Sequence, residues 1–131
     1  MKANSFYKVE TDNAPKAIGP YSQAIVSDNL IFCSGQIAIN PINNEIIKGG
    51  IKEQTEQIIN NLKNILISAG TDLAKVIRTE VFLKNMDDFK DMNEIYAKYF
   101  ISDPKPARIT VEVSRLPKDV SIEIGCIAIK E

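Results

Sequence analysis

The last strand-like run of this chain is apolar on both of its faces, and that pattern limits the folds open to it. Ile124 and Cys126 alternate with Ile127 and Ile129. Successive side chains of a strand point to opposite faces of its sheet, so this strand needs apolar cover on two sides. Helices can cover one side, but the second side must be covered too.

Several other segments are strand-like, and most are separated by turn signals. Asp28-Asn29 is a plausible tight turn between two strands. In residues 76–84, Ile77, Thr79, Val81 and Leu83 alternate with Arg78, Glu80 and Lys84. The chain between 11 and 20 and the Asn-rich stretch from 40 to 50 are expected to be loops. The expected strands cover residues 5–9, 22–27, 30–34, 76–84, 108–113 and 120–127.

Two segments have helical periodicity. In the first, apolar residues recur at steps of three and four from Ile51 to Ala69, and Gly70 is placed to end the helix. The second carries a stripe of large side chains, which we interpret as core packing against a sheet. That stripe consists of Phe89, Met92, Ile95, Tyr96, Tyr99 and Phe100.

Together these elements predict an α+β fold. A single mixed, mainly antiparallel sheet would carry two helices on one face. The 131 residues are enough for one domain, which we place at residues 1–131. Neither helix is left to cover the second apolar face, so we expect the chain to associate with copies of itself.

Arg108 and Glu123 are the most informative charged residues. Each lies in one of the two C-terminal strands, and residues 115–119 between them form a turn. If these strands pair as a hairpin, a guanidinium and a carboxylate come close together on a largely apolar sheet. Arginine can hold a carboxylate with two parallel hydrogen bonds, and a glutamate beside it could activate a water. The pair therefore suggests a site for a small organic acid. Arg115 and Lys118, in the turn itself, are interpreted as solvated charges.

Composition excludes several other classes of site. The chain contains no histidine, which excludes Ser-His-Asp and Cys-His catalysis and histidine-bound zinc. Its two cysteines, Cys33 and Cys126, lie far apart in apolar runs and are expected to be buried free thiols. A net charge of −1 with scattered basic residues disfavours nucleic-acid binding. Without an apolar leader or a 20-residue apolar run, the protein is expected to be cytoplasmic.

Five blocks of the sequence resemble the reactive-intermediate deaminase family (Rid, also called YjgF), and in particular its RidA group. They occur in the family's order, from about Ala14 to the C-terminus. The blocks are residues 14–24, 34–37, 81–89, 93–96, and the segment from Pro106-Ala107-Arg108 through Leu116-Pro117-Lys118-Asp119 to Ile122-Glu123-Ile124.

The resemblance implies a chorismate-mutase-like homotrimer with its clefts between subunits. It also implies an activity, 2-iminobutanoate/2-iminopropanoate deaminase, which hydrolyses 2-imino or enamine acids from pyridoxal-phosphate dehydratases to 2-keto acids and ammonia. No cofactor and no metal are implied. Arg108 matches the arginine that holds the substrate carboxylate, and Glu123 the glutamate that positions water. The substrate-binding positions carried over are Tyr21, Ser34, Gly35, Asn93 and Thr110, of which Thr110 stands where several members carry cysteine.

Alternative interpretations stay open. Arg108 and Glu123 could form an ion pair that closes a subunit contact, because paired charges survive burial. Tyr21 could be a packed turn residue, and Asn93 could bind backbone near a helix. At the level of function, a non-catalytic trimer that senses a small acid or binds a partner is the second hypothesis. An RNA-cleaving translation inhibitor is the third and is disfavoured by charge and by the missing histidine.

Overall fold

The computed structural model describes residues 5–130, and its centre is a six-stranded sheet in the order β1-β2-β3-β8-β6-β7. Neighbouring strands run antiparallel except β6 and β7, which are parallel. The strands are β1 (Phe6–Val9), β2 (Ala24–Ser27), β3 (Leu30–Gln36), β6 (Val76–Leu83), β7 (Ala107–Glu112) and β8 (Ile122–Ile129).

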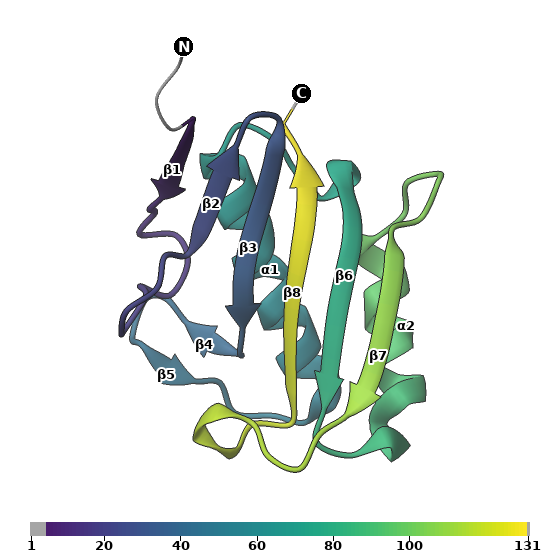
Figure 1. The fold of residues 1–131 in the computed structure, drawn as a ribbon. Coiled ribbons are helices and arrows are strands. Elements are labelled where there is room, and N and C mark those ends of the chain that lie inside the picture. The colour runs from purple at the N-terminus through teal and green to yellow at the C-terminus, as the bar shows by residue number, and fades with distance from the viewer. Residues whose placement is uncertain (1–4, 131) are drawn as a thin grey trace.

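Two helices cover one face of this sheet, α1 (Ile51–Ser68) and α2 (Phe89–Tyr99), as Figure 1 shows. The expected α+β architecture is thus confirmed. The apolar stripe of α1 is fully buried at Ile58, Ile59 and Leu62, and Gly70 turns the chain at a φ of +95°. The other helical turns are 3₁₀ segments at Leu73–Lys75, Met86–Asp88 and Pro117–Asp119. None of the helices in residues 5–130 is long and apolar enough to cross a membrane.

The expected hairpin of the last two strands is wrong. The strand that carries Arg108, β7, pairs in parallel with β6, and β8 pairs with β3 and with β6. One strand therefore separates β7 from β8, as the ribbon shows (Figure 1). The helix α2 makes the crossover between β6 and β7, which is the connection that parallel neighbours require.

Two smaller differences from the sequence predictions concern local structure. Residues 40–50 contain a short antiparallel pair, β4 (Ile39–Asn40) and β5 (Glu45–Ile46), within the expected loop. In β6, Ile77 was expected on the face of Thr79 and Val81, but the pairing with β8 is irregular between Val76 and Arg78. That irregularity leaves Ile77 41% exposed while Val76 is buried.

The face of the sheet turned away from the helices, here called the open face, is largely apolar. Phe32 and Ile109 point to it and are 42% and 43% exposed. Ile127 lies in register with Phe32 and is only partly buried. The expectation that the second face would be apolar and free of helices is therefore confirmed for the described residues.

Candidate active site

Glu123 lies in a cleft of about 530 Å³ near the start of β8, here called the Glu123 cleft. Its neighbours Ile122 and Ile124 are buried under the helices, so the alternation of the strand turns Glu123 to the open face. Burial raises the pKa of its carboxyl above the ordinary value. The cleft is lined by Pro15, Lys16, Ile18, Tyr21, Ser34, Gly35, Gln36, Ile37, Ile39, Pro117, Lys118 and Glu123.

Three sequence-predicted binding residues share the Glu123 cleft. Gly35 lies so close to Glu123 that a Cβ at this position would overlap the carboxylate oxygen Oε2. The Ser34 hydroxyl donates to the Ser22 carbonyl oxygen at 2.6 Å, which fixes the backbone at the mouth of the cleft. Tyr21 lines the cleft and is 53% exposed. The carboxylate thus has an aromatic side chain and bare backbone as neighbours.

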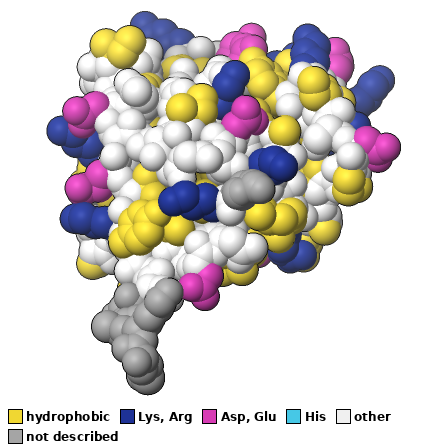
Figure 2. All heavy atoms as spheres, turned by 90° about the horizontal axis from the view of Figure 1, so that it is seen from above, with side chains coloured by type: hydrophobic (Ala, Val, Ile, Leu, Met, Phe, Trp, Pro, Cys, Tyr) yellow, Lys and Arg dark blue, Asp and Glu magenta, His cyan; other side chains and the backbone are white. Residues whose placement is uncertain are grey.

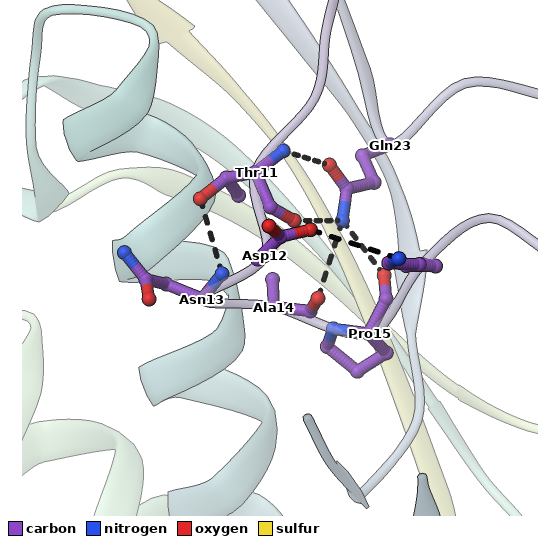
Figure 3. A network of polar contacts seen from close by, with 7 residues as sticks. Thr11, Asp12, Asn13, Ala14, Pro15 and Gln23 are labelled. Carbon is purple, nitrogen blue, oxygen red and sulfur yellow. Dashed lines mark hydrogen bonds and ion pairs between the residues drawn. The ribbon is translucent and has the colours of Figure 1, made fainter. Parts of the chain in front are cut away.

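The rim on the N-terminal side is held by one buried amide, Gln23. Its side-chain nitrogen donates to the carbonyl oxygens of Thr11 and Pro15 at 3.1 and 2.8 Å, and its oxygen accepts from the Thr11 N–H at 2.8 Å (Figure 3). These hydrogen bonds hold the backbone of residues 11–15 in place, and with it the cleft-lining residues Pro15 and Lys16. The sequence motifs did not single out Gln23, although it lies within the block 14–24.

Arg108 lies elsewhere, on the helix-covered side of edge strand β7. It is in register with buried Thr79, whose hydroxyl is 2.7 Å from the Tyr96 hydroxyl of α2. The Arg108 carbon Cζ stands 4.8 Å from the centre of the Tyr96 ring and 5.5 Å from that of Phe89. Its Nη1 donates to Asn93 Oδ1 at 2.6 Å. We call Arg108, Asn93, Phe89 and Tyr96 the Arg108 cluster.

The Arg108 cluster is built to present a guanidinium. The two rings stack against the group and hold its plane, while one of its five N–H donors binds Asn93. Arg108 itself is exposed, so its other donors face solvent. Thr110 follows two residues later on the same face of β7, and its hydroxyl oxygen is buried without a hydrogen-bond partner in the described residues. The aromatic pair under Arg108 was read from the sequence as core packing alone.

The structure therefore divides the sequence-predicted residues into two groups. Tyr21, Ser34, Gly35 and Glu123 share one cleft, whereas Asn93, Arg108 and Thr110 lie together near α2. Arg108 is level with Cys126 on β8, three residues from Glu123, and two strand spacings away. These offsets put the two Cα atoms about 14 Å apart, with the side chains on opposite faces of the sheet. No ion pair between Arg108 and Glu123 forms within the chain.

Neither group offers a typical metal site. Within residues 5–130, no three His, Cys, Asp or Glu side chains gather closely enough to hold an ion. The view from above in Figure 2 shows basic and acidic side chains interspersed with apolar ones, and no basic expanse on that face.

Comparison with known proteins identifies the family. Residues 11–130 match the family model described as Endoribonuclease L-PSP. A RutC family protein of Pyrococcus horikoshii is 60% identical over 121 residues, covering 92% of this chain and 95% of that protein. The human 2-iminobutanoate/2-iminopropanoate deaminase is 43% identical over 122 residues, covering 93% of this chain and 88% of that protein.

A solved structure agrees in the fold. A putative endoribonuclease of Thermotoga maritima superposes with a TM-score of 0.92 at 51% identity, covering 95% of this chain and 98% of that one. The resemblance inferred from the five sequence blocks is thereby confirmed. The chain belongs to the L-PSP family, the Rid or YjgF family of reactive-intermediate deaminases.

Proposed function

We propose that this protein is a cofactor-independent hydrolase that converts 2-imino and enamine acids, such as 2-iminobutyrate and 2-iminopropionate, to 2-keto acids and ammonia. The observation that carries the proposal is the Glu123 cleft, in which a carboxyl of raised pKa faces bare backbone at Gly35. A carboxylate with a raised pKa is a better general base than an ordinary one. Membership of a family that includes imine deaminases supplies the substrate class.

The reaction suits a site without histidine. The imine carbon is already electrophilic, more so when its nitrogen is protonated. Glu123 takes a proton from water as the water oxygen bonds to that carbon, which gives a 2-amino-2-hydroxy acid. Glu123 then passes that proton to the nitrogen and takes up the proton of the new hydroxyl as the C=O bond forms and the C–N bond breaks, so that ammonia and the 2-keto acid leave. A general base of this kind contributes about 10²–10⁴-fold to the rate.

Because Arg108 and Glu123 lie far apart within one chain, the proposed active site requires more than one copy of the chain. One chain supplies a water-activating cleft and, about 14 Å away, a guanidinium with free donors. We place the active site between two copies, with Glu123, Tyr21 and Gly35 from one and Arg108, Asn93 and Thr110 from the other. The apolar open face favours such association, and closed cyclic symmetry gives each copy one complete site. We propose a homotrimer.

The test is suppression of a trapped imine. A serine/threonine dehydratase generates the imine, semicarbazide traps it, and this protein is added at increasing concentration. We expect the semicarbazone signal to fall, and to fall at least 10²-fold less efficiently with Arg108→Ala. Lys63→Met, an exposed change on α1, is the matched control and should behave as wild type. A protein that leaves the signal unchanged while still binding 2-oxobutyrate would instead favour the ligand-sensing alternative.

A further inference from the structure

The Glu123 cleft poses an electrostatic problem for the proposed reaction. Its half-buried Glu123 carboxylate carries the same sign as the carboxylate of a 2-imino acid. Like charges in a partly desolvated cleft repel, which weakens binding and slows entry. Within one chain Arg108 lies on the far side of the sheet, so the cleft wall holds no arginine of its own. In the proposed assembly the neighbouring copy's Arg108 brings one positive charge, which the Glu123 carboxylate already balances.

Two lysines line the same cleft, Lys16 and Lys118. They come from two separate loops, residues 10–23 before β2 and the Pro117–Asp119 turn before β8. With both ammonium groups charged and Glu123 ionised, the lining carries a net charge of +1. No acidic side chain other than Glu123 lines the cleft, but Lys16 also pairs with Asp12 outside it at 3.8 Å. Among the described residues Lys118 has no such ion-pair partner, so it is the main source of positive charge at the cleft. The electrostatic potential of the cleft lining therefore favours an anion, although Glu123 is negatively charged.

The backbone at Lys118 is unusual for a lysine. Lys118 has a φ of +55° and Asp119 a φ of +57°, so two consecutive residues with a Cβ lie in the left-handed region. Glycine adopts this region freely, whereas other residues are crowded in it. Strained backbone of this kind gathers at functional sites, where the surrounding structure enforces it.

The surrounding structure does enforce it. Leu116 and Val120, on either side of the Pro117–Asp119 turn, are 7% and 4% exposed and anchor both of its ends. Arg115 binds the Asp119 carboxylate through Nε at 2.8 Å and through Nη2 at 3.4 Å. The Asp119 N–H donates to the Leu116 carbonyl oxygen at 3.0 Å. The turn is thus a fixed support that directs residue 118 to the cleft.

We propose that Lys118 is a substrate-binding residue of the Glu123 cleft. Its ammonium group, assisted by Lys16, makes the cleft positive and binds the anionic 2-imino or 2-keto acid beside Glu123. This inference rests on the proposed function and adds a binding residue to it. It also explains why a position that glycine would fill with less strain carries a long cationic side chain.

The first experiment removes the charge of residue 118 while keeping a side chain of similar length. Titration calorimetry measures the Kd of 2-oxobutyrate for wild type, Lys118→Met, Lys118→Arg and the control Lys63→Met. We expect binding to weaken about 5- to 10-fold in Lys118→Met, while the other two variants stay within about twofold of wild type. Raising NaCl from 50 to 500 mM should weaken wild type more than Lys118→Met, because one screened contact is missing from the variant.

The second experiment uses the backbone. Lys118→Gly removes the charge and suits the left-handed conformation, so we expect an unchanged or higher melting temperature together with the same 5- to 10-fold loss of affinity. In the imine assay the loss should fall on kcat/KM, with kcat changed by less than about twofold. A stabilised but weak-binding variant separates ligand binding from support of the fold.

The outcomes are distinguishable. If wild type removes the imine but Lys118→Met and Lys118→Gly match its Kd and kcat/KM, the role of Lys118 is overturned and the proposed function stands. If wild type neither removes the imine nor binds 2-oxobutyrate, the proposed function fails and this inference fails with it.

Discussion

Gly35 shows how a single missing side chain can shape this site. A Cβ at Gly35 would occupy the place of the Glu123 carboxylate oxygen, whereas Gly125 opposite has only ordinary van der Waals neighbours. The Glu123 carboxylate can therefore occupy its place in the cleft only because residue 35 has no side chain of its own. This is a steric constraint, and sequence periodicity carries no trace of it.

We expect Gly35→Ala to displace Glu123 and to lower kcat/KM for the imine by about 10²-fold, close to the effect of losing a general base. The double variant Gly35→Ala with Glu123→Gln should be no worse than Glu123→Gln alone, because both changes remove the same group. Steady-state kinetics of the four proteins gives this cycle. Independent, multiplicative losses would show that Gly35 acts through something other than Glu123.

Cys126 gives a prediction for pH dependence at the residue scale. A hydrogen bond with the Cys33 side chain and burial raise the pKa of the Cys126 thiol well above the ordinary value. Above the unfolded thiol pKa of about 8.5, the unfolded chain loses a proton that the folded chain keeps. The free energy of unfolding should therefore fall as pH rises from about 8.5 toward the raised folded pKa.

Denaturant unfolding of wild type and Cys126→Ala between pH 7 and 9.5 measures this. The variant should be less stable at pH 7 by about 1–2 kcal/mol because of the lost packing, yet its stability should fall less steeply above pH 8.5. Parallel curves for the two proteins would contradict the assignment of the slope to Cys126.

At the scale of elements, the strands and helices were predictable, but the order of strands in the sheet was not. Turn residues between β7 and β8 suggested a hairpin, because adjacent strands with a short connection usually pair. The apolar pattern of β8 on both faces was the competing signal, since a strand of this kind belongs in the middle of a sheet. β7, which is exposed along Ala107, Arg108 and Ile109, belongs at an edge. The apolar pattern of β8 is thus a better guide to the strand order than the short connection between β7 and β8.

A buried amide on α1 links that helix to the wall of the Glu123 cleft. Asn61 is fully buried, and its side-chain nitrogen donates to the Ile39 carbonyl oxygen at 2.9 Å, with a longer contact to that of Ile37 at 3.5 Å. Both isoleucines line the cleft. Asn61 thus holds the Ile37–Ile39 backbone, which is part of the cleft wall, at a fixed place against α1.

We expect Asn61→Ala to lower the free energy of unfolding by about 1–3 kcal/mol, because the part-buried Ile39 carbonyl oxygen loses its amide donor and the Gln57 side chain loses its acceptor. The Ile37 carbonyl oxygen keeps the Ile39 N–H as a donor. Asn64→Ala is the matched control: Asn64 is also on α1 and also binds a carbonyl oxygen, that of Asn13 at 2.8 Å, but at the surface. Its cost should be about 0.5 kcal/mol. If urea titrations gave the same loss of unfolding free energy for both variants, burial of Asn61 would contribute nothing to the stability of the fold.

At the scale of the whole molecule, the sequence singled out both groups of candidate residues, and the structure shows that one chain does not bring the two groups together. The family resemblance singled out Arg108 and Glu123, and the hairpin offered a reason for their proximity that the structure removes. Within one chain, two side chains on opposite faces of a sheet have no direct route to each other. The proposed site therefore joins them through contact between two copies.

That requirement makes a complementation test decisive. Arg108→Ala and Glu123→Gln chains with different affinity tags are co-expressed, and complexes carrying both tags are purified. In a cyclic trimer of two chains of one kind and one of the other, one of the three interfaces joins an intact Arg108 to an intact Glu123. We therefore expect about one third of the wild-type activity from two inactive chains. Co-expression of Arg108→Ala with the Arg108→Ala, Glu123→Gln double variant should restore none, since no intact guanidinium is present. An inactive mixture of the two single variants would place both residues' roles within one subunit, where the 14 Å between their Cα atoms leaves Arg108 unable to reach a substrate held at Glu123.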